Sequence, residues 1–163
     1  MRLSKSSRGI VLASAVAGLV VLSMVGVSVA QSYSASPAYG TASLRPGFMP
    51  DPHSVNLTAG GPINTRTSGP APACGYVANA PDFRLNWAGG GNLNIYAISG
   101  ADTTLLINMP NGTWRCNDDG GQGNNPLLNI AGAPAGQYDI WVGTYGSSTS
   151  PAQLRISELA PRW

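Results

Sequence analysis

Apolar and polar residues alternate with a period of two through most of the chain, and this pattern predicts short β-strands. It is strongest where Tyr138, Ile140 and Val142 would share one face of a strand. Asp139 and Trp141 would then share the opposite face. Similar segments are predicted at 39–44, 54–58, 75–80, 83–87, 92–98, 103–109, 113–116, 127–130 and 153–159. Because no helical periodicity of 3.6 residues is found after residue 30, the chain is predicted to be all-β.

Turn signals separate these segments at short, even intervals. Pro110, Asn111 and Gly112 form a hairpin signal between two apolar segments. Glycines at 89–91 and the cluster at 132–136 mark further turns. Short strands with regular turns are typical of a β-sandwich. We therefore expect one antiparallel sandwich domain over residues 39–160, preceded by a flexible lead at 31–38 that lacks periodicity.

The first thirty residues have the pattern of a secretory signal. Arg2, Lys5 and Arg8 precede an apolar run at 9–27, and small residues at 28–30 offer a cleavage site. Cleavage after residue 30 would place the mature chain in the periplasm or outside the cell, without a transmembrane segment. An uncleaved membrane anchor is the alternative, because the run approaches the ~20 residues that span a bilayer.

Cys74 and Cys116 are the two cysteines of the chain. An exported protein meets an oxidising compartment, so a disulfide between them is expected. Free thiols are the less favoured alternative, and a metal or redox pair would need closer spacing. Closing this loop would stabilise the fold by about 4 kcal/mol on the chain-entropy account.

The charge distribution argues against a nucleic-acid partner. Three of the nine basic residues lie in the first thirty positions. The remaining chain has six arginines against seven acidic residues. It therefore offers no basic patch for nucleic acid or for an anionic membrane surface.

The residue types give little support for an enzyme. His53 is the only histidine, and no Gly-x-Ser-x-Gly motif is present. Neither a serine-hydrolase triad nor a zinc site is therefore expected. His53 is predicted to lie in an exposed, proline-rich loop. The alternative is a small hydrolase in which Asp118 and Asp119 act as paired carboxylates.

An oxygen-rich, glycine-rich loop between residues 117 and 126 favours calcium instead. Calcium prefers six to eight oxygen ligands from carboxylates, amides and main-chain carbonyls. The candidate ligands are Asp102, Asn117, Asp118, Asp119, Asn124 and Asn125. Their spacing matches no established calcium motif. The alternative is a long turn in which Asp and Asn side chains cap their own backbone.

Aromatic residues offer a second type of binding site, because their flat faces can stack on sugars or peptides. Trp141 is the best candidate, since it shares a face with Asp139 rather than with Ile140 and Val142. Trp141, Asp139 and Tyr145 form the predicted ligand site. The alternative is a tryptophan buried in the sandwich.

Three motifs resemble those of a known family. They are Asp102-Thr-Thr-Leu followed by Pro110-Asn-Gly, then Cys116-Asn-Asp-Asp-Gly-Gly, and then Ala133-Pro-Ala-Gly-Gln-Tyr-Asp-Ile-Trp-Val-Gly. Over residues 73–159 this order resembles the bacterial pre-peptidase C-terminal domain. The resemblance implies a jelly-roll-like β-sandwich, often attached to secreted proteases, with relatives that bind calcium and collagen or polysaccharide. No catalytic domain precedes these residues, so the module is expected to stand alone.

These observations favour a non-enzymatic, exported binding or accessory module. Its expected partner is a polysaccharide or an envelope or extracellular protein, recognised through loops and exposed aromatic residues. Calcium is the candidate stabilising ion. The alternatives are the small hydrolase and a purely structural envelope domain.

Overall fold

The computed structural model describes residues 31–68 and 73–163, so the secretory signal predicted at 1–30 lies outside the described residues. Within these ranges it contains eleven β-strands and no helix, and hence no helix that could cross a membrane. The strands are β1 (Thr41–Leu44), β2 (His53–Ala59), β3 (Ile63–Asn64), β4 (Tyr76–Val77), β5 (Phe83–Trp87), β6 (Leu93–Ser99), β7 (Thr103–Asn108), β8 (Trp114–Asn117), β9 (Leu127–Ile130), β10 (Gly136–Thr144) and β11 (Ser150–Ser157).

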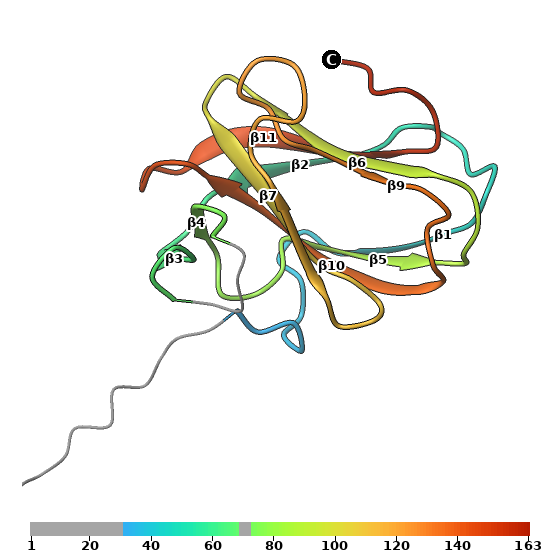
Figure 1. Ribbon diagram of the computed structural model, residues 1–163, viewed down its shortest axis with the longest axis horizontal. Coiled ribbons are helices and arrows are strands. Elements are labelled where there is room, and N and C mark those ends of the chain that lie inside the picture. Colours follow the sequence, from blue (N-terminus) through green and yellow to red (C-terminus); the bar gives the residue numbers. More distant parts are fainter. Residues whose placement is uncertain (1–30, 69–72) are drawn as a thin grey trace, which may run out of the picture.

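The strands form two sheets that pack face to face (Figure 1). The first, called sheet A here, contains β1, β5, β10, β7 and β8 in that order. β4 pairs with the end of β10, on the same edge of β10 as β5, and β3 pairs with β4. The second, sheet B, has the order β2-β11-β6-β9. All neighbouring strands are antiparallel except β1 and β5. The predicted all-β, jelly-roll-like sandwich is confirmed.

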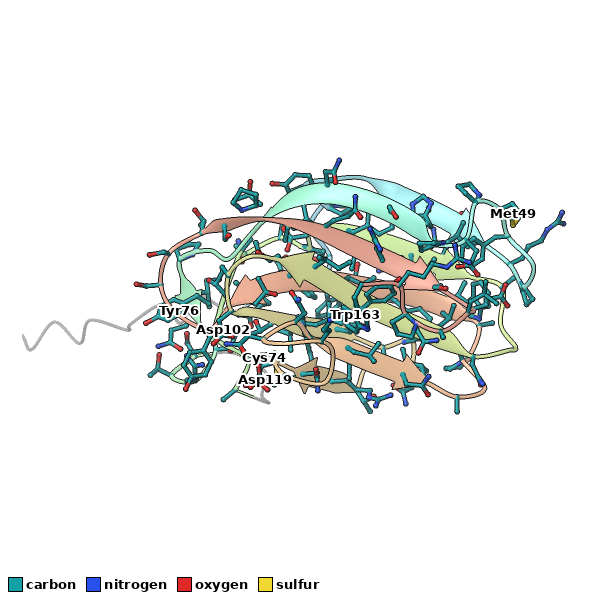
Figure 2. All side chains as sticks on the ribbon, turned by 90° about the horizontal axis from the view of Figure 1, so that it is seen from above. Met49, Cys74, Tyr76, Asp102, Asp119 and Trp163 are labelled. Carbon is teal, nitrogen blue, oxygen red and sulfur yellow. A yellow bond between two sulfur atoms is a disulfide. The ribbon has the colours of Figure 1, made fainter. Side chains whose placement is uncertain are left out.

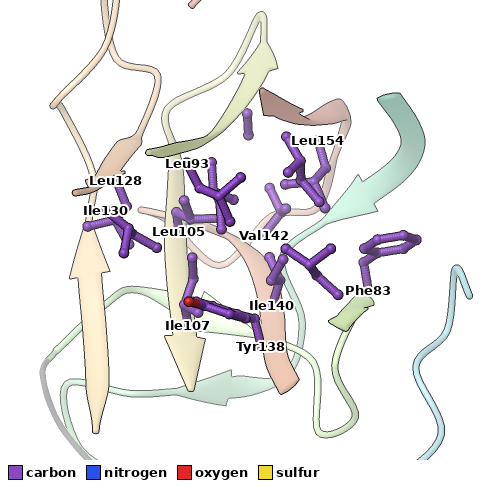
Figure 3. Packing of buried hydrophobic residues seen from close by; sticks show 14 of the residues in the cluster. Phe83, Leu93, Leu105, Ile107, Leu128, Ile130, Tyr138, Ile140, Val142 and Leu154 are labelled. Carbon is purple, nitrogen blue, oxygen red and sulfur yellow. The ribbon is translucent and has the colours of Figure 1, made fainter. Parts of the chain in front are cut away.

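The main core lies between the two sheets. Strand β10 contributes Tyr138, Ile140 and Val142 to it, as the alternation in the sequence predicts. Leu105 of β7 and Leu154 of β11 pack in the same cluster and are fully buried (Figure 3). Because β10 pairs with β5 on one side and β7 on the other, its side chains lie at the middle of sheet A.

A second apolar cluster covers part of the outer face of sheet A. Trp141 and Leu106 lie opposite each other on β10 and β7, and Leu106 lies opposite Cys116 on β8. The segment that carries β3 and β4 folds over these side chains, and its Val77 is fully buried among them. The predicted disulfide between Cys74 and Cys116 is present and joins this segment to β8.

Residues 31–38 are held against the sandwich, which corrects the flexible lead predicted for them. The main-chain N–H of Ser32 donates to Asn79 O at 2.9 Å, and that of Ala38 donates to Pro81 O at 2.9 Å. The Arg84 guanidinium donates to Tyr33 O at 2.7 Å. A segment without side-chain periodicity is thus fixed through its backbone, which the hydrophobic pattern does not reveal.

The segment after β11 folds back over the outer face of sheet B. Asn94 donates to Leu159 O at 2.8 Å, and Tyr96 Oη accepts the N–H of Arg162 at 3.1 Å. The Trp163 ring packs edge-on against Tyr96, with centroids 5.1 Å apart. A side chain at Gly121 would collide with that ring, so the loop between β8 and β9 passes closely beneath Trp163.

Reduction of the disulfide is expected to destabilise the protein strongly. The free energy of unfolding should fall by about 4 kcal/mol, because the unfolded chain regains the freedom of a long loop. Urea denaturation with and without reductant measures this difference. A Cys74→Ala/Cys116→Ala double variant, which should be insensitive to reductant, is the control. Equal midpoints for the oxidised and reduced wild-type protein would contradict the expectation.

Asp82 is a buried carboxyl group that gives the fold a pH dependence. Its side chain is 2% exposed and accepts one hydrogen bond, from Val142 N at 2.7 Å. Burial raises its pKa from 3.8 to about 7, and the hydrogen bond opposes this only in part. The folded state therefore holds this proton more tightly than the unfolded state does.

The contribution of Asp82 to stability should consequently be fully present below pH 4 and be lost as pH rises through about 7. Replacement by Asn removes the titration while keeping an acceptor for Val142 N–H. The stability of Asp82→Asn relative to wild type is expected to increase from pH 4 to pH 8, as measured by urea denaturation at each pH. A pH-independent difference would show that Asp82 titrates normally.

Candidate functional site

Polar side chains and one tryptophan form two rows across the uncovered part of the outer face of sheet A. Residues opposite each other on neighbouring strands share a face, so the register of pairing places them together. The first row is Arg84, Asp139, Asn108 and Trp114, on β5, β10, β7 and β8. The second row is Ser43, Asn86 and Gln137, on β1, β5 and β10. The strand pairing thus brings together residues that are far apart in the sequence.

A cavity of about 410 Å³ opens over the first row. It is bordered by the hairpin between β7 and β8, by the turn before β10 and by the segment at 31–38. The main lining residues are Tyr33, Asn108, Pro110, Trp114, Gln137 and Asp139. Two aromatic rings and three polar side chains therefore surround this space, which we call the Trp114 cavity.

A hydrogen-bond network fixes the floor of the Trp114 cavity. Arg84 Nε donates to Asp139 Oδ1 at 2.6 Å, and Gln137 Nε2 donates to Asp139 Oδ2 at 2.7 Å. The Arg84 guanidinium also donates to the carbonyls of Tyr33 and Ala35. Asp139 is 1% exposed and has both oxygens engaged. Its role is to neutralise Arg84 and orient Gln137, and the amide of Gln137 is the group that a ligand can reach.

The prediction that Trp141 presents its ring to a ligand is wrong. Its side chain is fully buried in the second apolar cluster, because β3, β4 and the disulfide cover that part of the sheet. Trp114, rather than Trp141, is the tryptophan that lines the cavity. Its ring lies 5.3 Å from that of Trp141, at 38°, and also lines the cavity. The position of Trp114 directly after the Pro110 hairpin, on a strand at the edge of the sheet, is a signal that sequence reasoning could have used.

A second cavity, of about 500 Å³, adjoins the first. It is lined by Ser43, Leu44, Arg45, Asn86, Trp87 and Ala88, and it shares Gly136 and Gln137 with the Trp114 cavity. We call it the Arg45 cavity. The sequence did not predict that these residues share a cavity, since β1, β5 and β10 come together only in the folded chain.

Asp102 and Asp119, two of the predicted calcium ligands, are seen toward the same end of the molecule as Cys74 and Tyr76 in Figure 2, and neither lines the two cavities. Asp102 is close enough to Asp119 and Asp118 for their charges to raise its pKa, although burial is the larger cause. A hydrogen bond from Asn124 acts in the opposite direction. Asp102 Oδ1 is buried and has no hydrogen-bond partner among the described residues. Asp102 therefore lies in the neighbourhood of Asp118, Asp119 and Asn124.

The side chains of Asn117 and Asn125 accept hydrogen bonds from main-chain N–H groups of the loop and of its neighbouring strand. Asn117 Oδ1 accepts the N–H groups of Gly120 at 2.7 Å and Leu127 at 2.8 Å. Asn125 Oδ1 accepts the N–H of Ser99 at 2.9 Å. These oxygens satisfy the backbone, as the turn alternative expects. In the part of the chain that the structure describes, no three His, Cys, Asp or Glu side chains are arranged to hold a metal ion.

Tyr145 does not join Asp139 and Trp141 in one site. It follows β10 and is exposed, with the Arg66 guanidinium 4.2 Å above its ring centre. Its main-chain N–H donates to Asp102 O at 3.1 Å. Tyr145 therefore belongs to the region of Asp102, whereas Asp139 belongs to the Trp114 cavity.

The residues considered for catalysis are not assembled for it. Asp118 and Asp119 are exposed on the loop, and Asp118 Oδ1 accepts the N–H of Asp119 at 3.1 Å. Neither lines the two cavities described above. His53 is half-buried in β2 beside Phe83, rather than in an exposed loop, and burial lowers its pKa.

The known proteins similar to this chain include two solved structures and a sequence relative. The pre-peptidase C-terminal domain of a Bacillus anthracis collagenase has a TM-score of 0.48 and 14% identity, covering 76% of this chain and 99% of that one. It is a domain of the family that the motifs resemble. Aeromonas hydrophila PliG, a periplasmic inhibitor of g-type lysozyme, has a TM-score of 0.36 and 15% identity, covering 72% and 96%.

No family model matches the sequence. An uncharacterised protein of Synechococcus elongatus is 33% identical over 94 residues, which cover 55% of this chain and 68% of that protein. At this identity and coverage, the chain belongs to the same family as the Synechococcus elongatus protein.

Proposed function

We propose that this protein is a non-enzymatic, exported accessory module that binds a polysaccharide on the outer face of sheet A. The observation that carries the proposal is the Trp114 cavity, where aromatic rings and amide side chains surround an open space. Aromatic rings supply flat apolar contact area. Amides offer both donors and acceptors, which suits the hydroxyl groups of sugars.

The rigidity of the cavity supports a binding role. Asp139 is held by Arg84 and Gln137, and Trp114 rests on the buried ring of Trp141. A site whose side chains are already ordered loses less conformational entropy when a ligand binds. Because both oxygens of Asp139 are engaged, the cavity does not offer this carboxylate as a general acid or base. The disulfide is consistent with export to an oxidising compartment.

Substitution of Trp114 or Gln137 tests this proposal. Trp114→Ala and Gln137→Ala are each expected to weaken polysaccharide binding by about tenfold or more, which corresponds to ~1.4 kcal/mol. Isothermal titration against a panel of neutral and acidic oligosaccharides measures the Kd. Gln137 is exposed, so its removal should leave the fold intact even if loss of Trp114 loosens the packing on Trp141.

Gln122→Ala is the matched control, because Gln122 is exposed on the loop between β8 and β9 and lines neither cavity. It should bind like wild type. If the wild-type protein binds no member of the panel, or if both cavity variants bind as tightly as Gln122→Ala, the proposed function is wrong.

We also propose that calcium stabilises the loop between β8 and β9. The observation in favour is the buried, unpartnered Asp102 Oδ1 beside Asp119 and Asn124. Two carboxylates and an amide are donors that calcium accepts, and water would complete its shell. Asn117 and Asn125 are omitted from this set, since their oxygens already bind N–H groups.

Calcium should therefore raise the stability of the folded protein. A ligand that binds only the folded state adds about 2.7 kcal/mol at a hundredfold excess over its Kd. Thermal unfolding with calcium and with a chelator measures the shift. Asp119→Asn should reduce it, whereas Glu158→Gln should keep it, because Glu158 is engaged with Gly47 elsewhere. An unchanged midpoint at millimolar calcium would show that the loop is a turn without an ion.

A further inference from the structure

We propose that the Trp114 and Arg45 cavities are two subsites of one groove, and that its ligand is an acidic polysaccharide whose anionic group is bound by Arg45. This inference rests on the proposed function and specifies its substrate class.

The two cavities adjoin each other. Gly136 and Gln137, at the start of β10, line both of them. Gly136 adds no side chain at this junction, and a Cβ there would lie 2.7 Å from Pro110. The exposed amide of Gln137 therefore stands between the subsites and can contact a ligand that passes from one to the other.

The length of the groove favours an extended chain over a single sugar. It runs from Trp114 on β8 across β7, β10 and β5 to Ser43 on β1. Four spacings of about 4.8 Å between neighbouring strands give roughly 19 Å. Several linked sugar rings are needed to fill that distance.

The groove also contains an arginine that forms no ion pair within the described residues. Three charged side chains line or underlie the two cavities, namely Arg84, Asp139 and Arg45. Arg84 and Asp139 form an ion pair at 2.6 Å and cancel each other. Arg45 is exposed and makes no ion pair within the described residues. The carboxylate of Glu158 reaches the same loop, where it accepts the N–H of Gly47 at 2.6 Å, but it forms no ion pair with Arg45.

The Arg45 cavity has the features needed for an acidic sugar. Leu44 supplies partly exposed apolar surface, and Asn86 supplies an exposed amide. A guanidinium beside them can form two parallel hydrogen bonds with a carboxylate. Because this charge lies at one end of a groove otherwise lined by neutral side chains and one compensated pair, we infer a sugar polymer rather than an acidic peptide.

Oligogalacturonates and their methyl esters provide a matched test, since esterification removes the charge and keeps the backbone. Oligomers of alginate and hyaluronan extend the acidic set. Wild type should bind at least one acidic oligomer about tenfold more tightly than its ester or a neutral analogue of the same length. Affinity should increase from the disaccharide to the hexasaccharide and should fall with added salt.

Arg45→Gln should lose the preference for the acidic form and most of the salt dependence. Arg162→Gln is the matched control, because it removes the same charge from an exposed position that lines neither cavity. It should retain both properties. The inference is overturned if Arg45→Gln behaves like Arg162→Gln, or if affinity does not depend on oligomer length.

The outcomes separate this inference from the proposed function. If Gln137→Ala weakens binding but charge and Arg45 have no effect, the module binds a neutral polysaccharide and only the further inference fails. If no oligosaccharide binds, both fail. Tight binding of poly-glutamate that depends on Arg45 but not on Trp114 would identify an acidic peptide as the ligand and would also overturn the inference.

Discussion

The structure depends on covering both faces of β10. This strand pairs along both edges, and every residue from Tyr138 to Thr144 is buried. Sheet B covers the inner face, as in any two-layer sandwich. The outer face has no second sheet, so the tryptophan there needs a cover of its own. The segment that carries β3 and β4 supplies it, and the disulfide to β8 holds that segment in place.

The boundary of this cover creates the groove. Beyond Trp114 the cover ends, and the outward residues of β10 and β7 change from apolar to polar within two positions of the strand. Trp141 and Asp139 illustrate the change, because they share a face but lie on opposite sides of the boundary. One sheet face thus serves as a core at one end and as a binding surface at the other.

Local patterns in the sequence were sufficient for every strand except the two-residue β3, and for the fold class and the disulfide. Alternation reports which residues share a face, and turn residues report where strands end. Neither reports what lies over the face, which explains the error at Trp141: its cover comes from residues more than sixty positions earlier. The groove could not be predicted from the sequence either, because Ser43, Asn86 and Gln137 are brought together only by strand pairing. Asn117 and Asn125 carry the right atoms for a metal site, but the backbone of their own loop uses them.

The order of strands in sheet B affects how this protein can fold during synthesis. Strand β11, the last of the eleven, lies between β2 and β6 and pairs with both. Until residues 150–157 are available, β2 has no partner within the sheet, and β6 keeps one free edge. The sandwich therefore closes only when nearly the whole chain is present, and such long-range pairing makes folding slow. A chain interrupted before β11 would expose two unpaired strand edges, which are prone to associate with other chains.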